Sequence, residues 1–392
     1  MKVSVSVSDL NRMLKTAGKL IDPTGMLAGK AALSVHDGIF EVFVLSLNGR
    51  VTELRLSTAA GDVYNDDFEY VPAENGFCVV RAKDLVAPLK NAKKGSEIVI
   101  EAHKDIVHVT ASDFAYDLPT ACDPAEFPRP VELKGDPAET VEIAPDDIPC
   151  FRFIVSALSR DTTRPEFTGA VLRDGALIST DSHRLHYCPL PALFGTGELA
   201  GIISPELVSF IADGHAGTLT EYREQKEVKI DQKTEKQTVA TWHVLEAPGV
   251  CIKSRPISGG FPDLKRAFPS YRLDETVEVD AKTLASAIKP LYAGWKINLR
   301  IALRNSPDGV RLECSGKPGP KSGDLPPRTA VLKGIELPHL PVILNPSYIM
   351  DALSGVSGQV TFCCIDRDSP VWIGEWSPLK FGRGALIMPC QL

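Results

Sequence analysis

The sequence predicts an α+β protein of three similar domains, each with two helices packed on antiparallel sheets. The first observation is an internal repeat. Residues 139–143 read ETVEI, residues 275–279 read ETVEV, and a helical pattern follows each of them. A second strand-then-helix unit appears later in both copies, at 200–213 and 342–354. The second observation is length, because 392 residues are too many for one compact core. We expect three consecutive domains, which cover residues 1–133, 138–272 and 273–392.

The first predicted domain begins with a strand at residues 2–7, where valine alternates with polar residues. Ser8 and Asp9 can cap a following helix that runs to Leu20. A second helix is predicted at 82–94. The other strands expected in this domain lie at 32–35, 39–45, 51–56, 77–80, 97–101, 106–111 and 114–118. The order of strand, helix and further strands therefore occurs twice within it.

The second and third predicted domains follow the same order. Their helices are expected near 146–158, 205–213, 281–293 and 346–354. Asp174-Gly175 separates two apolar strands, and such a pair favours a hairpin because both turn residues tolerate positive φ. Residues 221–241 are dense in Lys, Glu and Gln and fit no repeat. They predict an extended hairpin inserted in the second domain, most simply a solvated excursion of the chain.

Composition excludes several classes of protein. The chain is 44% hydrophobic, 24% charged and 7% aromatic, which is typical of a globular protein, and it contains no long apolar run. We therefore expect neither a membrane span nor a signal peptide. Its nine cysteines are scattered and form no CxxC pair, which predicts reduced core thiols, no zinc site and a cytoplasmic protein. The formal net charge of −7 argues against indiscriminate binding to nucleic acid.

Basic residues nevertheless gather on the predicted helices, while acidic residues concentrate in strands and loops. A protein with this pattern can hold a polyanion on one surface and repel it elsewhere. The alternative is that these are ordinary solvated helix faces. Aromatic residues are not interleaved with them, so any contact with DNA would be to phosphates. The candidate DNA-binding residues are Arg12, Lys15, Lys19, Lys90, Lys93, Arg152, Arg160, Arg164, Lys282 and Lys289.

A polar stretch, TDSHR at residues 180–184, follows the second strand of the predicted hairpin. Asp181, Ser182 and His183 are residue types used in acyl transfer, but sequence adjacency is not triad geometry, and no GxSxG motif is present. His183 and His186 lack a carboxylate that would complete a metal set. We find no P-loop and no GxGxxG. The sequence therefore predicts no catalytic residues, no metal and no cofactor.

Four stretches carry a resemblance to a known family. STDSHRLHYCPLP, at 179–191, resembles the ATDGHRL signature of the bacterial DNA polymerase III β subunit, the sliding clamp. GGFPDLKRAFPS, at 259–270, is similar to the FPDxxRxxP of that family, and the terminal IMPCQL is similar to its MPxRL. The stretch from VRAKDL, at 80–85, to AEFP, at 125–128, follows its first domain.

The resemblance implies a head-to-tail homodimeric ring of clamp domains that encircles double-stranded DNA without reading its sequence. Such a clamp tethers a DNA polymerase, and the clamp loader also binds it, each through a short linear motif in a cleft between the second and third domains. Carried over motif by motif, the cleft residues are Phe167, Thr180, Ser182, His183, Arg184, Leu185, Pro262, Arg266, Ala267, Leu386, Met388, Pro389, Cys390, Gln391 and Leu392.

The sequence also departs from the family pattern. Ser182 replaces a glycine, and Gln391 replaces the penultimate arginine. At the expected joint between subunits, residues 317–321 read KPGPK where acidic residues are usual, and Asp113 and Asp117 stand where basic residues are common. We therefore predict a joint of reversed polarity, whose dimers weaken at high salt.

Three functions remain open from the sequence. The first is a non-catalytic sliding clamp. The second is a clamp-fold scaffold that binds partners but closes no ring on DNA. The third, in the enzyme class, is a hydrolase that uses Asp181 and His183.

Overall fold

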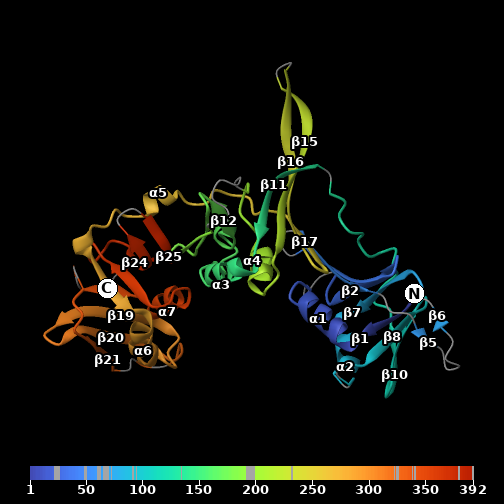
Figure 1. Ribbon diagram of the computed structural model, residues 1–392, viewed down its shortest axis with the longest axis horizontal. Coiled ribbons are helices and arrows are strands. Elements are labelled where there is room, and N and C mark those ends of the chain that lie inside the picture. The colour runs from blue at the N-terminus through green and yellow to red at the C-terminus, as the bar shows by residue number, and fades with distance from the viewer. Residues whose placement is uncertain are drawn as a thin grey trace. The chain divides into compact units, whose positions relative to one another are not determined.

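The computed structural model of the protein describes residues 1–21, 27–47, 51–59, 63–64, 70–71, 73–90, 92–93, 95–133, 135–190, 199–230, 233–321, 323, 326–337, 339, 341–377 and 380–390. Helices and antiparallel sheets together confirm the predicted α+β class. The chain forms two compact units (Figure 1). Unit 1 comprises Met1–Glu142 and Gly217–Pro256, and unit 2 comprises Ile143–Ala216 and Ile257–Leu392.

The smaller sheet of unit 1 is four-stranded and antiparallel. Its order is β1 (Lys2–Ser6), β8 (Glu97–Ala102), β9 (Ile106–Ala111) and β10 (Phe114–Pro119). Helix α1 (Val7–Ala17) directly follows β1, and α2 (Ala82–Leu89) follows β7 (Gly76–Arg81). The side chains that α1 buries include Leu10, Met13, Leu14 and Ala17, a spacing that places them on one face of the helix.

The larger sheet of unit 1 has eight strands and joins distant parts of the chain. It runs in the order β11 (Asp136–Ile143), β15 (Gly217–Ile230), β16 (Lys233–Ala247), β17 (Val250–Ser254), β4 (Thr52–Ala59), β3 (Ile39–Ser46), β2 (Lys30–His36) and β7. Strands β17 and β4 pair along their length, with Val250 opposite Leu56 and Ser254 opposite Thr52. Residues 217–256 therefore share a sheet with the first predicted domain. β5 (Val63–Tyr64) and β6 (Tyr70–Val71) pair as a separate two-stranded ladder.

Strands β15 and β16 confirm the hairpin expected at 221–241. They pair from Thr218 opposite Glu246 to Ile230 opposite Lys233, with a shift in register between Glu224 and Gln225. The far half of the hairpin extends beyond the sheet (Figure 1).

A buried ion pair fixes the chain at residue 131 to the β17–β4 junction. Glu53 and Lys253 are both buried, and Lys253 Nζ lies 2.9 Å from Glu53 Oε1. Glu53 Oε2 accepts the backbone N–H of Val131 at 2.6 Å, and Lys253 Nζ donates to the Val131 carbonyl at 2.7 Å. The pair thus satisfies both backbone groups of one residue, which offsets the cost of burying two charges.

Unit 2 contains a seven-stranded sheet that also joins distant segments. Its order is β12 (Ala170–Arg173), β13 (Ala176–Thr180), β14 (Arg184–Pro189), β25 (Lys380–Ile387), β24 (Val371–Ser377), β23 (Gln359–Cys363) and β18 (Thr276–Asp280). A four-stranded sheet runs in the order β21 (Arg328–Lys333), β20 (Gly309–Lys317), β19 (Ile297–Ser306) and β22 (Val342–Leu344). The helices are α3 (Ile148–Val155), α4 (Pro205–Ala212), α5 (Leu264–Ala267), α6 (Ala281–Tyr292) and α7 (Pro346–Ser354).

Several local predictions are confirmed, and others need correction. Helix α7 has the predicted bounds, and the turn residues Asp174 and Gly175 have φ of 51° and 69°, as the hairpin requires. Helix α1 begins earlier than expected, because the Ser6 hydroxyl rather than Ser8 accepts the N–H of Asp9. Helix α2 ends at Leu89 rather than 94, with Pro88 in its last turn. The strand expected at 200–203 is present only as isolated bridges at Ile202 and Ile203.

The expectation that every cysteine is a reduced thiol is also wrong. Cys150 and Cys188 form a disulfide. The sequence gives no sign of this pair, because the two cysteines are 38 residues apart and only folding brings β14 into contact with α3. None of the helices in the described residues is both long and apolar enough to cross a membrane.

Candidate binding site

The polar stretch predicted at 180–184 is the turn that joins β13 to β14, and its own side chains shape it. Asp181 Oδ1 accepts the backbone N–H groups of His183 and Arg184, each at 3.0 Å. Thr180 Oγ1 accepts the N–H of Ser182 at 3.1 Å and donates to the Arg184 carbonyl at 2.6 Å. Short polar side chains that bond nearby backbone groups favour turns over continued strand. The turn leaves the His183 side chain exposed.

Ser182 has a φ of 74°, in the left-handed region. Residues with a Cβ rarely adopt this conformation, whereas glycine does so at little cost. The backbone therefore gives a physical reason for the glycine that stands here in the ATDGHRL signature.

Arg184 binds this turn to two helices. Its Nε lies 3.2 Å from Asp181 Oδ2, its Nη1 pairs with Asp351 on α7, and its Nη2 donates to the carbonyl of Ser156 at the end of α3. The guanidinium carbon lies 4.3 Å from the centroid of the Tyr348 ring. Only 9% of Arg184 is exposed. Each nitrogen of the guanidinium thus has a partner inside the protein, so Arg184 anchors the turn to α3 and α7.

Arg184 also lines a cavity of about 660 Å³, which is within the size range of small-molecule sites. Its wall mixes charged side chains of both signs with hydroxyls and two aromatic rings. The lining residues are Ser156, Leu158, Ser159, Arg160, Asp161, Arg164, Phe167, Asp181, Ser182, His183, Arg184, Tyr348 and Asp351.

One side of the cavity carries two exposed arginines, Arg160 and Arg164. The guanidinium carbon of Arg164 lies 4.1 Å from the centroid of the Phe167 ring, and its Nε is 3.9 Å from Glu166. Asp161 lies between these arginines in the sequence, and hydrogen bonds from Thr163 lower the pKa of its carboxyl group. The sequence predicts that both arginines contact DNA, yet they line the same cavity as His183.

Burial is the main reason that the pKa of Tyr348 is raised, and the nearby Asp181 adds to it. Tyr348 therefore stays a neutral hydroxyl at physiological pH, with its ring against Arg184. Sequence reasoning missed Tyr348 and Asp351, because helical spacing on α7 gives no sign that this helix faces the β13–β14 turn. It also missed Ser156, Leu158, Ser159, Asp161 and Asp181 as lining residues.

Four of the predicted cleft residues, Phe167, Ser182, His183 and Arg184, line this cavity. Met388 is 43% exposed, and its N–H donates to the His183 carbonyl at 2.9 Å. Other members are structural neighbours of the turn. Thr180 is buried in it, whereas Leu185, Leu386 and the half-buried Ala267 belong to one apolar cluster together with Trp372 and Phe268.

The remaining predicted cleft residues lie on two further segments. Pro262, Pro389 and Cys390 are half-buried, and the Cys390 N–H donates to the Ile343 carbonyl of β22 at 2.8 Å. Arg266 belongs to the short helix α5. Gln391 and Leu392 lie outside the described residues.

Within the described residues, no contact joins the Asp181 carboxylate to the His183 imidazole. Both oxygens of Asp181 face the turn backbone or Arg184. His186 is buried, and its Nδ1 lies 3.0 Å from the Phe153 carbonyl. Across the part of the chain described here, no three His, Cys, Asp or Glu side chains are arranged to hold a metal ion.

The other candidate DNA-binding residues are all exposed. Arg12 pairs with Asp9 at 2.8 Å on α1, and Lys93 pairs with Asp113 at 3.2 Å. Arg152 on α3 donates from Nε to the Ala212 carbonyl at the end of α4. The rest are Lys15 and Lys19 in and after α1, Lys90 after α2, and Lys282 and Lys289 on α6.

Several solved structures of bacterial sliding clamps have the same fold. The DNA polymerase III subunit beta of Pseudomonas aeruginosa has 19% sequence identity and a TM-score of 0.73, with 100% of each chain covered. The Helicobacter pylori beta clamp bound to a DNA ligase peptide has 18% identity, a TM-score of 0.72 and the same coverage. A Pseudomonas aeruginosa sliding clamp bound to griselimycin has 18% identity and a TM-score of 0.74, again over both full chains.

No protein-family model matches the sequence, and no curated protein sequence matches it either. At these identities the structural likeness establishes the fold alone. The chain has the fold of the bacterial DNA polymerase III beta subunit over its full length, which confirms the fold that the sequence resemblance implied.

Proposed function

We propose that the protein is a DNA sliding clamp, a processivity factor that encircles double-stranded DNA and tethers a replicative polymerase. The observation that carries this proposal is the full-length match to bacterial clamps, with a TM-score of 0.73 and 100% coverage of both chains. A clamp holds DNA by enclosure, so weak and numerous phosphate contacts are sufficient. Catalysis is not needed for this function, and we propose none.

In this proposal three clamp domains, 1–133, 138–272 and 273–392, form each subunit of a homodimeric ring. The exposed basic residues on or just after α1, α2, α3 and α6 face the DNA, while the net charge of −7 repels DNA from the outer surface. Arg160 and Arg164 are the weakest members of the DNA-binding set, because both line the cavity beside His183. We expect the protein to be cytoplasmic, with no membrane partner.

The cavity and the turn beside it form the proposed partner site. Polymerase and clamp loader would each insert a short linear motif, with its polar part near His183 and its apolar anchor near Met388. The DNA ligase peptide bound to the Helicobacter pylori clamp supports a peptide as the occupant, and the griselimycin bound to the Pseudomonas aeruginosa clamp shows that a clamp of this fold also takes another ligand.

Retention on circular DNA tests the proposal. The protein is loaded on nicked circular duplex DNA with a clamp loader, and half of the sample is then linearised with a restriction enzyme. An encircling clamp stays on the circle and slides off the linear ends. Equal release from both forms would contradict the clamp proposal.

A scaffold with the clamp fold that closes no ring is the second candidate. One observation favours it: Asp113 and Asp117, expected at the joint between subunits, already pair with Lys93 and His108 of their own chain. Such a protein would bind griselimycin yet show no preference for circular DNA. The hydrolase alternative gains no support from the Asp181 contacts described above.

A further inference from the structure

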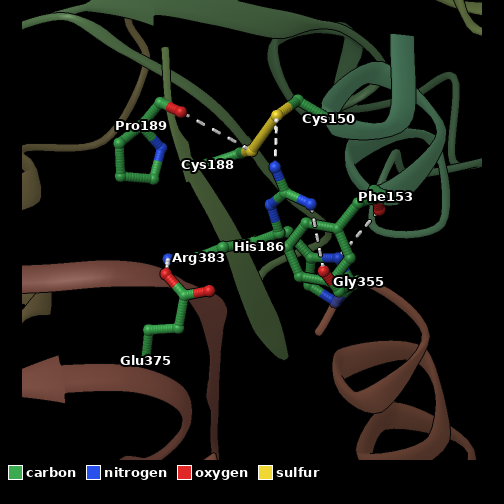
Figure 2. Close-up of a disulfide and its surroundings, with 8 residues drawn as sticks. All are labelled: Cys150, Phe153, His186, Cys188, Pro189, Gly355, Glu375 and Arg383. Atoms are coloured by element: carbon green, nitrogen blue, oxygen red, sulfur yellow. Dashed lines mark hydrogen bonds between the residues drawn. A yellow bond between two sulfur atoms is a disulfide. The ribbon is translucent and has the colours of Figure 1, made fainter. Parts of the chain in front are cut away.

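The disulfide joins the helix that leads into the cavity to the strand that carries Arg184. Cys150 lies on α3 and Cys188 on β14, with their Cα atoms 5.9 Å apart (Figure 2). Both residues are almost completely buried, at 2% and 0% exposure. The other cysteines in the chain are unpaired thiols, so this pair is distinct from them.

A cation lies directly beside the sulfurs. Arg383 of β25 donates from Nη2 to Cys150 Sγ at 3.1 Å and from Nη1 to the Gly355 carbonyl at 3.3 Å (Figure 2). A guanidinium next to a cysteine stabilises the thiolate, the form that attacks a disulfide. The same contact therefore favours exchange when the pair is reduced.

The helix that Cys150 anchors continues into the cavity wall. Helix α3 ends at Val155, and Ser156 and the residues after it line the cavity. Strand β14 holds this exit through Arg184, which bonds the Ser156 carbonyl, and through His186, whose ring stacks on Phe153 with centroids 4.3 Å apart. The disulfide is thus an additional connection between α3 and β14, set back from the cavity.

We propose that Cys150 and Cys188 form a thiol–disulfide switch that controls the cavity. In the oxidised form α3 is fixed to β14, so the wall from Ser156 to Asp161 is held in the shape that binds a partner. In the reduced form α3 can move relative to β14. A partner must then order the cavity wall when it binds, which weakens its affinity. This inference rests on the proposed function, since it describes regulation of the same site.

Thiol–disulfide exchange with a small-molecule disulfide, such as oxidised glutathione, converts the reduced form to the oxidised form. The Cys150 thiolate attacks one sulfur of that disulfide and breaks its S–S bond, and the leaving thiolate takes up the proton that Cys150 lost. The Cys188 thiolate then attacks the Cys150 sulfur, and the second glutathione leaves as a thiol with the Cys188 proton. Two protein thiols are oxidised and one small disulfide is reduced to two thiols. Because both sulfurs are buried, each step requires a local opening of α3.

Griselimycin is the probe for the binding test, which uses the full chain and isothermal titration calorimetry. We expect the oxidised protein to bind it about tenfold more tightly than the protein reduced with dithiothreitol. The Cys150→Ser/Cys188→Ser variant should bind like the reduced protein under both conditions. The matched control Cys251→Ser removes a half-buried thiol of unit 1 and should respond to reduction as the unchanged protein does. Equal affinity of the oxidised and reduced protein would overturn the proposal.

A second readout does not depend on any ligand. Hydrogen exchange of the amides from 150 to 161 should be at least tenfold slower in the oxidised protein, and Arg383→Gln should slow formation of the disulfide by glutathione severalfold. Mass spectrometry after alkylation identifies the pair. If griselimycin binds neither form but exchange still depends on oxidation, the proposed partner site is wrong and the switch stands, while retention on circular DNA tests the clamp itself. Unchanged exchange, or thiols that glutathione leaves free at 150 and 188, would refute the switch itself.

Discussion

The backbone N–H of Met388 donates to the carbonyl oxygen of His183 across 2.9 Å, which joins the C-terminal segment to the β13–β14 turn. The contact continues the β14–β25 ladder, in which Arg184 lies opposite Ile387. Both His183 and Met388 have exposed side chains. Two residues from the middle and the end of the chain therefore form one edge, with a polar and an apolar member.

Replacing both residues, His183→Ala and Met388→Ala, should weaken griselimycin binding at least tenfold, or about 1.4 kcal/mol, because an interface anchor and its polar neighbour are lost together. The melting temperature should change little, since both side chains are exposed. Leu47→Ala, which removes another exposed apolar side chain in unit 1, is the control. Calorimetry that finds unchanged affinity in the double variant would remove this edge from the binding site.

Arg184→Ala should destabilise the protein by about 3 kcal/mol, because it leaves Asp181, Asp351 and the Ser156 carbonyl without their partner in a largely buried place. Urea denaturation measures the change. The control Arg367→Ala breaks an exposed pair with Asp368 and should alter stability by no more than about 0.5 kcal/mol. A loss of similar size in the two variants would mean that Arg184 does not anchor the turn.

Ser182→Gly should stabilise the protein by about 0.5–1 kcal/mol. The backbone at this position has a φ of 74°, a conformation that is unfavourable for a residue with a Cβ. The free energy gained by removing this strain is larger than the free energy lost because glycine makes the unfolded chain more flexible. Ser182→Ala keeps the Cβ and should give no such gain. Thermal and urea unfolding of the three proteins decide the point, and a less stable glycine variant would contradict the argument.

His186 should make the protein sensitive to acid. Burial, assisted by the charge of Arg184, lowers its pKa from 6.5 to about 3. The unfolded chain takes up a proton near pH 6.5 and the folded chain does not, so stability is complete above pH 6.5 and falls as the pH drops towards 3. We expect a loss of about 2 kcal/mol at pH 5 relative to pH 7.5. His186→Gln should remove this part of the pH dependence, as measured by urea unfolding at both values.

The proposed joint should respond to salt and to charge reversal. Analytical ultracentrifugation should find dimers at low ionic strength and monomers at high ionic strength, because Asp113, Asp117 and Lys321 are exposed, and salt screens exposed charges. Lys317→Glu/Lys321→Glu should weaken the dimer, and Asp113→Lys/Asp117→Lys in the same chain should restore it. If neither ionic strength nor charge reversal changes the fraction of dimer, then other groups hold the subunits together.

The sequence predicted most strongly those features that depend on neighbouring residues. The 346–354 helix and the Asp174-Gly175 turn follow from local spacing and backbone preference, and both are present with the expected bounds and φ values. Helix α1 shows the limit of such reasoning. Ser6 and Ser8 are both good caps, and only the end of strand β1 decides that Ser6 is used.

The candidate site depends on tertiary contacts, so the sequence predicted only part of it. Motif resemblance identified His183 and Met388, yet Tyr348 and Asp351 reach the cavity from α7, whose own sequence gives no sign of it. In the sequence, nothing distinguishes Arg160 and Arg164 from other exposed cations. Only the fold shows that they line a cavity together with the turn at 180–184. The sequence does not predict the disulfide for the same reason, since α3 and β14 are far apart in the sequence and meet only in the folded chain.

The β17–β4 ladder, with the Glu53–Lys253 pair beneath residue 131, has a consequence for proteolysis. The covalent connection near 131–136 is not what holds residues 1–130 to residues 217–256, because an antiparallel ladder and a buried ion pair already do so. A protease that nicks the chain there should leave both fragments associated and eluting together from a sizing column. For the same reason the predicted thirds should not be separately expressible, since each cut would uncover the unpaired edge of a strand.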